Sequence, residues 1–401
     1  MWRWRRGTQG LGLGILPVVV VVVLLKVLWP SSVPRPSTVL HLMNTSTYLN
    51  SLHHMSLEPT TSIGTCRNNK ADVLLIVPSS VANHEARQAV RKSWGAHLPS
   101  SWPLVFFIGA TNDRSLQDRV TAEAKQHGDI AQDLSFHDSY SNLTLKTLSL
   151  LSWAQNFCRD TSYVLKIDDD VFLNVKRLYK LTVCVTEARQ NIYRTKREDN
   201  PLNSGLQELT PFSLSSVDSS LENLCNGFKP HQSINYLINS QSHEYESYMF
   251  AGYLYDGIRA DRNPHSKWYL DPKIYSSDIL PPFLSGTSYI MTSNIIPHLL
   301  EEAKSKPIIE LEDVYISGLV GYSGLKLKLS HLEGWSRFRP RWDSPCMYRE
   351  LITAHGLSPS ELSAMTRAIN NLSSDDCNGF LVYLANSFNS FVSSIFPRLP
   401  K

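Results

Sequence analysis

From Asp72 onward, short continuous apolar runs alternate with segments that carry a helical pattern. The first run, 73–77, has five apolar residues in succession and is followed by Pro78, which fits a strand buried on both faces. Strands and helices joined by short connections are typical of an α/β domain with a largely parallel sheet. We expect further strands at 104–108, 130–136, 163–167, 288–291 and 325–329, and helices at 83–94, 115–127, 145–157, 295–304 and 311–319.

Two stretches depart from this alternation. Residues 30–70 contain four prolines among Ser, Thr, Asn and His without an apolar period, which predicts a solvated stem. Residues 185–247 are polar and rich in Ser and Asn, which predicts an insertion lying over the surface. The folded domain is therefore expected at 71–401, interrupted by this insertion.

The N-terminus has the pattern of a membrane anchor. A basic tail, 1–10, precedes a 19-residue apolar stretch, 11–29, whose helical length of about 28 Å matches a bilayer core. The upstream arginines predict a cytosolic N-terminus and a single-pass type II anchor. A cleaved signal peptide is the alternative, although no small-x-small cleavage site follows the apolar stretch. Both interpretations place the rest of the chain on the exoplasmic side.

The charge balance excludes one class of partner. Arg3, Arg5 and Arg6 supply the whole excess of 39 basic over 36 acidic residues, so the remainder of the chain is balanced. Nucleic-acid binding requires a basic field, and none is expected here.

Cysteines and glycosylation sequons agree with an oxidising compartment. Six cysteines without any C-x-x-C pair predict disulfides rather than a zinc site, with fifteen possible pairings. We expect Cys66–Cys158, Cys184–Cys225 and Cys346–Cys377. Three sequons stand at Asn44, Asn142 and Asn371.

Three consecutive aspartates, Asp168, Asp169 and Asp170, directly follow the buried run 163–167. Open α/β sheets bind ligands at the carboxyl ends of their strands. In extended backbone Asp168 and Asp170 point to one side and Asp169 to the other. Carboxylates this close predict a hard divalent ion, Mn²⁺ or Mg²⁺. The alternative is a solvated acidic turn.

A second acidic segment, Glu310 to Tyr315, stands at the start of an expected helix. The helix dipole favours acidic residues at such a position, so the segment has a purely structural explanation. The other interpretation is a general base, because a carboxylate accepts a proton from an attacking hydroxyl.

These segments, together with three others, resemble family 31 glycosyltransferases, the group of β-1,3-galactosyltransferases and β-1,3-N-acetylglucosaminyltransferases. The resemblance runs from about Cys66 to Cys377 and rests on an ordered series of motifs. They are Glu85–Gly95 (EARQAVRKSWG), Asp138–Thr147 (DSYSNLTLKT), Asp168–Asp170 (DDD), Pro281–Tyr289 (PPFLSGTSY) and Glu312–Val314 (EDV).

The resemblance implies a GT-A fold, a UDP-sugar donor, inversion, and usually Mn²⁺. It implies Asp313 as the catalytic base, and Asp168 and Asp170 as metal ligands, with His331 completing the site. The resemblance also implies that Asp168 and Asp169 contact the nucleotide of the donor and its phosphates. Contacts there from Arg87, Arg91 and Lys146 are also expected, with ion pairing as the alternative for the two arginines.

The same resemblance implies a luminal catalytic domain in the Golgi membrane. Galactose is the expected sugar, with N-acetylglucosamine or N-acetylgalactosamine as alternatives, and the acceptor is a glycan on a glycoprotein or glycolipid. Two other classes stay open: a non-catalytic relative that helps another enzyme fold, and an adhesion protein. A homo- or heterodimer also stays open.

Overall fold

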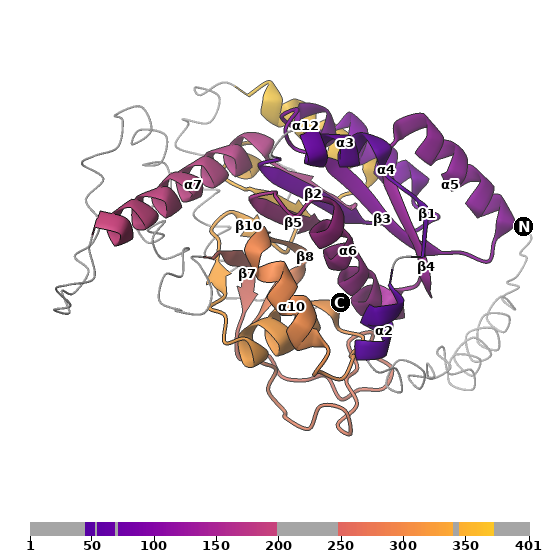
Figure 1. Ribbon diagram of the computed structural model, residues 1–401. Coiled ribbons are helices and arrows are strands. Elements are labelled where there is room, and N and C mark those ends of the chain that lie inside the picture. Colours follow the sequence, from indigo (N-terminus) through magenta and orange to yellow (C-terminus); the bar gives the residue numbers. More distant parts are fainter. Residues whose placement is uncertain (1–44, 53, 69–70, 199–247, 340–344, 373–401) are drawn as a thin grey trace, which may run out of the picture.

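A computed structural model describes residues 45–52, 54–68, 71–198, 248–339 and 345–372. Its main sheet consists of β1 (Met55–Leu57), β2 (Val73–Pro78), β3 (Leu104–Ala110), β4 (Ile130–His137), β5 (Tyr163–Ile167), β7 (Phe250–Tyr255), β8 (Phe283–Thr292) and β9 (Ser330–His331). The strand order is β1-β4-β3-β2-β5-β8-β7-β9 (Figure 1). Four of the seven neighbouring pairs are parallel, among them the continuous run β4-β3-β2-β5. The expected α/β class with a largely parallel sheet is confirmed.

A smaller sheet extends the carboxyl end of β5. It has the order β10 (Trp335–Ser336), β11 (Thr353–His355), β6 (Val171–Leu173). Strand β6 follows β5 after only three residues, Asp168–Asp170. This segment, the aspartate turn, therefore lies between the two sheets.

Helices cover both faces of the main sheet (Figure 1). Residues of β2 alternate between two cores: Leu74 and Ile76 belong to one, and Val73, Leu75 and Val77 to the other. This alternation is why the run is apolar throughout. The helices packed on the first core include α6 (Leu143–Phe157), α10 (Ile296–Ala303) and the π-helix η5 (Val314–Gly324). Those on the second include α4 (His84–Lys92), α5 (Arg114–His127), α7 (Val175–Glu198) and α12 (Pro359–Asn370).

Four short helical segments complete the described elements. They are η2 (Trp94–His97), η3 (Tyr140–Asn142), η4 (Ser293–Ile295) and α11 (Cys346–Arg349). Local signals in the sequence set several boundaries as expected. Helix α5, for example, ends at Gly128, whose φ of 66° is the left-handed conformation that glycine adopts readily.

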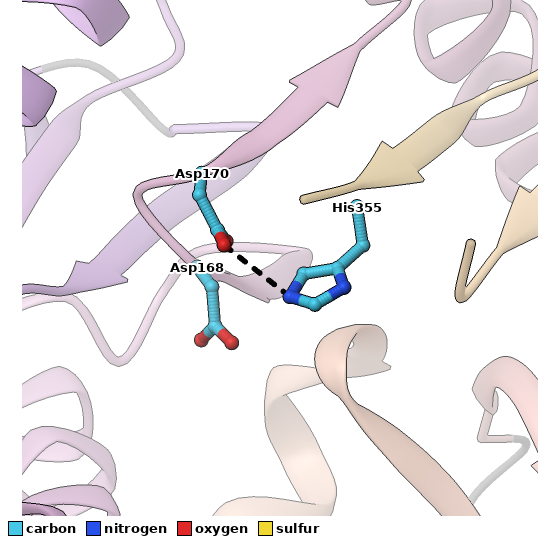
Figure 2. A group of neighbouring side chains, drawn as sticks. All are labelled: Asp168, Asp170 and His355. Atoms are coloured by element: carbon cyan, nitrogen blue, oxygen red, sulfur yellow. Dashed lines mark ion pairs between the residues drawn. The ribbon is translucent and has the colours of Figure 1, made fainter. Parts of the chain in front are cut away.

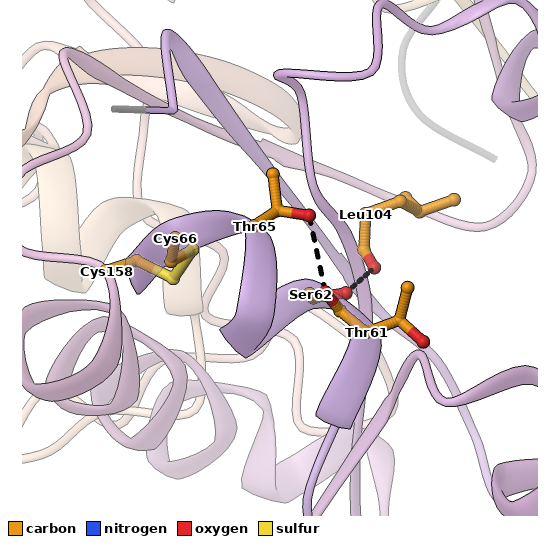
Figure 3. The surroundings of a disulfide bond; sticks show 6 residues. All are labelled: Thr61, Ser62, Thr65, Cys66, Leu104 and Cys158. Carbon is orange, nitrogen blue, oxygen red and sulfur yellow. Dashed lines mark hydrogen bonds between the residues drawn. A yellow bond between two sulfur atoms is a disulfide. The ribbon is translucent and has the colours of Figure 1, made fainter. Parts of the chain in front are cut away.

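Part of the expected stem is folded, so that prediction is wrong for residues 45–68. Helices α2 (Thr45–Ser51) and α3 (Thr60–Asn68) flank β1, which pairs with β4. Tyr48 is 1% exposed and donates its hydroxyl proton to the Leu145 carbonyl at 3.0 Å. The disulfide Cys66–Cys158 ties α3 to the end of α6, as expected (Figure 3). A few isolated apolar residues anchor this segment, and they form no period that the sequence alone reveals.

Two other expectations change. Residues 185–198 continue helix α7, so the start of the expected insertion is helical; residues 199–247 lie outside the described residues. The strand expected at 325–329 is absent from this described stretch, and pairing with β7 instead occurs at β9.

Several expectations fall on residues outside the description. These are the tail and anchor, 1–29, the remainder of the stem to residue 44, and the sequon Asn44. Among the described helices, none has the length and apolarity needed to cross a bilayer. Cys184 and Cys346 are each in a disulfide, but their expected partners, Cys225 and Cys377, are not described.

Candidate active site

The aspartate turn opens between β5 and β6. The Asp168 amide donates to the Thr287 carbonyl of β8 at 2.9 Å, which fixes the turn against the neighbouring strand. Strand β6 pairs with β11, with Val171 opposite His355. Long-range pairing thereby brings a histidine to a turn almost 190 residues away in sequence.

Asp168, Asp170 and His355 form one cluster, in which a ligand atom of each lies within 4.8 Å of the others (Figure 2). His355 Nε2 is 3.3 Å from an Asp170 carboxylate oxygen. Two carboxylates and an imidazole are a donor set that suits Mn²⁺. The residues present therefore fit the metal that the aspartate motif predicts.

The histidine in this cluster is not the one expected from the sequence. His331 lies on β9, where its Nδ1 accepts the Leu254 amide proton at 3.2 Å, and it is not a member of the cluster. His355 was missed because only the β6–β11 pairing places it near the aspartates. Its one sequence signal is a histidine ending a short β-prone run, Thr353-Ala354-His355.

Burial and charge shift the titration of this cluster. Burial, opposed by the Lys166 ammonium and reinforced by the Asp170 charge, raises the pKa of Asp168 to about 6. Burial alone would lower the pKa of His355, but the neighbouring carboxylates of Asp170 and Asp168 raise it overall.

Lys166, the fourth residue of β5, links this cluster to a second acidic group. Its ammonium donates to Asp168 Oδ1 at 2.7 Å and to the Gly286 carbonyl, and it lies 3.8 Å from Glu312 Oε2. Glu312 also accepts the Tyr289 hydroxyl proton at 2.7 Å. A buried ammonium is stable only with such partners.

Asp313 stands at the N-terminus of η5 and contacts Gly286, the same residue whose carbonyl accepts from Lys166. Its Oδ2 accepts the Gly286 amide proton at 3.1 Å, and its Oδ1 accepts that of Val314 at 2.9 Å. Burial, then the Glu312 charge, raises the pKa of Asp313 to about 6. A carboxyl group with this pKa is ionised at neutral pH and still basic enough to take a proton.

Asp169 points away from the cluster, as the strand geometry predicts. Its carboxylate accepts from the Ser79 hydroxyl at 2.6 Å and from the Asn83 amide at 3.1 Å. Both partners belong to the loop that follows β2. In this structure Asp169 joins that loop to the aspartate turn.

The two arginines and the lysine expected at the donor make internal contacts. Arg87 is 1% exposed and bonds Glu123, Ser79 and the carbonyls of Ser80 and Val81. Arg91 pairs with Glu123 and Asp129. For both, the structure supports the alternative of ion pairing.

Lys146 is likewise engaged within the protein. Its ammonium donates to the Ser79 carbonyl at 2.8 Å and to Asp138 at 2.6 Å. Burial lowers the pKa of Lys146, although Asp138 opposes this effect. Arg87, Lys146 and Asp169 thus converge on Ser79 and shape the loop after β2.

Replacing Glu123 with Gln should destabilise the protein strongly. Glu123 is 4% exposed and accepts from Arg87, Arg91 and His84, so its loss leaves buried guanidinium charge uncompensated. We expect the free energy of unfolding in urea to fall by about 3–5 kcal/mol. Glu85→Gln, which changes an exposed residue of α4, should stay within about 0.5 kcal/mol. A Glu123→Gln loss as small as that of the control would contradict the assignment.

Glu123 and its basic partners also predict how the free energy of unfolding depends on pH. Burial tends to raise the pKa of Glu123, but its bonds to Arg87, His84 and Arg91 lower it to about 2. The stabilisation is therefore complete above the ordinary glutamate pKa of about 4.5 and is lost as pH falls towards 2. Glu123→Gln should flatten the acid limb of the stability curve.

The described sequons differ in exposure. Asn371 is exposed at the end of α12. Asn142 is half-buried, and its amide donates to the His137 carbonyl at 2.7 Å. Asn371 is therefore the more accessible of the two for a glycan.

Comparison with known proteins agrees with this site. A family model described as galactosyltransferase matches residues 85–204 and 227–333, more than half of the chain. Beta-1,3-galactosyltransferase 5 of Mus musculus and of Homo sapiens are each 28% identical over 78% of this chain and 83% of their own. Beta-1,3-galactosyltransferase 1 of Mus musculus is 28% identical over 77% of this chain and 76% of its own.

Among solved structures, galactosyltransferase LgtC in complex with donor and acceptor sugar analogs aligns with 76% of this chain and 98% of its own. The TM-score is 0.30 at 11% identity, a similarity too weak to define the fold. The family match is independent of it and contains the aspartate turn and Asp313. The chain therefore belongs to the galactosyltransferase family, a family of glycosyltransferases.

Proposed function

We propose that this protein transfers galactose from UDP-galactose to the 3-hydroxyl of an acceptor glycan, with inversion and with the help of a divalent metal. The observation that carries the proposal is a metal-type cluster, Asp168, Asp170 and His355, near a separate carboxylate, Asp313. Both are linked to Gly286: its carbonyl accepts from Lys166, which also binds Asp168, and its amide donates to Asp313. The relatives named beta-1,3-galactosyltransferase support the sugar and the linkage. The acceptor class, a glycoprotein or glycolipid glycan, follows from the family resemblance alone.

Asp168, Asp170 and His355 are the residues that would hold Mn²⁺, within a donor site of GT-A type. When bound, the ion supplies positive charge that neutralises the departing diphosphate. The Lys166 ammonium donates a hydrogen bond to Asp168, and its positive charge limits the repulsion between Asp168 and Asp170. The intact carboxylates favour an active enzyme over a non-catalytic folding partner.

Asp313 acts as the general base in this proposal. It accepts the proton of the acceptor hydroxyl as that oxygen attacks the anomeric carbon of the donor. The bond from this carbon to the diphosphate oxygen breaks, and UDP leaves with the bonding electrons. A single base facing the acceptor gives inversion without a covalent intermediate. Gly286 and Val314 orient the carboxylate by donating one amide proton to each oxygen.

The rate of transfer should depend on pH through Asp313. Because its pKa is about 6, only the ionised fraction below that pH is active as a base. We expect kcat/KM, which reports the pKa of the free enzyme, to fall about tenfold per pH unit below pH 6 and to level off above pH 7. Mn²⁺ binding, followed by electron paramagnetic resonance at the same pH values, separates this effect from metal loss. A flat profile between pH 5 and 8 with metal still bound would contradict the role of Asp313.

We further propose that the protein is a single-pass type II protein of the Golgi membrane with a luminal catalytic domain. The apolar stretch 11–29, the sequons and the disulfide Cys66–Cys158 support this setting. The chain from residue 45 onward should be secreted when a cleavable signal replaces residues 1–44, because the domain begins at α2.

UDP release by this secreted domain tests the proposed function. UDP-galactose, UDP-N-acetylglucosamine and UDP-N-acetylgalactosamine are each supplied with a panel of β-linked acceptors, with Mn²⁺ or with chelator. Metal-dependent release from UDP-galactose is expected. Release from another donor would transfer the proposal to that sugar, and a folded protein that binds neither UDP nor Mn²⁺ would overturn it.

A further inference from the structure

Arg337 follows β10 and is surrounded by aromatic rings. Its guanidinium carbon lies 5.0 Å from the ring centre of Tyr253, 4.6 Å from that of Tyr255 and 4.3 Å from that of Phe338. Cation–π contacts of this kind hold a guanidinium by its faces. Its N–H groups lie in the guanidinium plane, so contacts with the ring faces do not use them.

No carboxylate balances this charge among the residues that the structure describes. Arg339, two residues later, pairs with Glu361, and Arg177 pairs with Glu350, but Arg337 takes part in no ion pair there. Its Nε is buried without a hydrogen-bond partner in the same part of the chain. A buried donor without an acceptor is costly, so this arginine is suited to an anion that is not part of the protein.

Arg337 lies near both parts of the candidate active site, the metal-type cluster and the carboxylate of Asp313. Ser336 of β10 lies opposite Ala354 of β11, so Arg337 and His355, a member of the metal-type cluster, are the next residues along two paired parallel strands. The guanidinium also packs on the Tyr255 ring, and the pKa of the Tyr255 hydroxyl is raised by burial and, to a lesser extent, by the charge of Asp313. The Tyr255 ring also stacks on Phe283, 4.9 Å between centres, at the start of the strand that carries Gly286.

We propose that Arg337 binds the diphosphate of the nucleotide-sugar donor and stabilises it as it leaves. The inference rests on the proposed function and adds a residue that lies beyond the segments matched by the family model. A planar guanidinium donates two parallel hydrogen bonds to phosphate oxygens, which an ammonium does not. The bonds formed and broken are those of the proposed transfer reaction. As the bond from the anomeric carbon to the diphosphate oxygen breaks, Arg337 donates hydrogen bonds to the oxygen that gains negative charge.

Calorimetric titration with UDP and with uridine, both in the presence of Mn²⁺, tests this role. Wild type is compared with Arg337→Met, which keeps an apolar stem between the rings and removes the charge. We expect Arg337→Met to weaken UDP binding by about 10- to 100-fold, the effect of one or two charged hydrogen bonds. Uridine, which has no phosphate, should bind both proteins equally. Inorganic pyrophosphate should show the same loss as UDP.

Arg339→Met is the matched control, because it removes a neighbouring arginine whose charge is already paired with Glu361. UDP binding to this control should equal that of wild type. Equal UDP affinity of wild type and Arg337→Met would overturn the inference, as would equal losses for UDP and uridine. If Arg337→Met instead raises only the KM for an acidic acceptor, the inference is also wrong. Failure of wild type itself to bind UDP with Mn²⁺ would be a failure of the proposed function.

Discussion

Asp313→Asn should abolish transfer while leaving UDP and Mn²⁺ binding nearly intact. An amide oxygen still accepts one of the two backbone protons that hold the carboxylate, so the local structure is retained. The amide does not accept the acceptor's proton, and loss of a general base costs about 10²- to 10⁴-fold in rate. Single-turnover transfer from UDP-galactose, measured beside calorimetric UDP binding, separates chemistry from affinity.

Glu310→Gln is the control for this experiment. Glu310 lies three residues earlier, is half-buried, and contributes no bond to the described site. Its neutral replacement should leave the rate within about twofold of wild type, since its carboxylate is not placed to accept the proton. Normal turnover by Asp313→Asn would refute the base assignment.

Asp170→Ala should lose metal binding and, with it, tight binding of UDP and transfer. Asp170 contributes one of two carboxylates to the cluster and is the partner of His355. Removal of a preorganised electrostatic contribution lowers rates by about 10²- to 10³-fold, and loss of the whole ion should exceed this. Electron paramagnetic resonance of Mn²⁺ with the variant gives the affinity directly.

Asp169→Asn provides the contrast, because its side chain faces Ser79 and Asn83 rather than the cluster. Its Mn²⁺ affinity should stay close to that of wild type. If Asp169→Asn lost the metal and Asp170→Ala kept it, the metal would be held on the other side of the turn.

The sequence predicted the parts of the fold that local patterns control. Strand β2 is apolar because both its faces are buried, and Gly128 ends α5 because its conformation suits glycine. The sequence predicts a solvated stem at residues 45–68 because few apolar side chains anchor this segment. One of them, Tyr48, is buried only through its contact with α6, which the local sequence does not reveal. The strand expected at 325–329 failed for a related reason: pairing with β7 selects which residues form the ladder.

The site divides in the same way. The three aspartates stand out in the sequence because they follow a buried strand, where open α/β sheets bind ligands. Within its acidic segment, Asp313 is singled out only by the family resemblance. His355 and Arg337 reach the site through the smaller sheet, whose strands pair across long stretches of chain. Arg87 and Arg91 were ambiguous because spacing of four on a helix suits an ion pair as well as a ligand contact. Only the position of Glu123 on α5 decides between them.

The stereochemistry of the product tests the central claim most directly. UDP-α-galactose and a β-linked acceptor are converted with Mn²⁺, and the new linkage is analysed by nuclear magnetic resonance. One base facing the acceptor and a metal facing the leaving group predict a β linkage, formed only when metal is present, and the names of the relatives support its formation at the 3-hydroxyl. An α-linked product, or transfer that continues in chelator, would contradict the account.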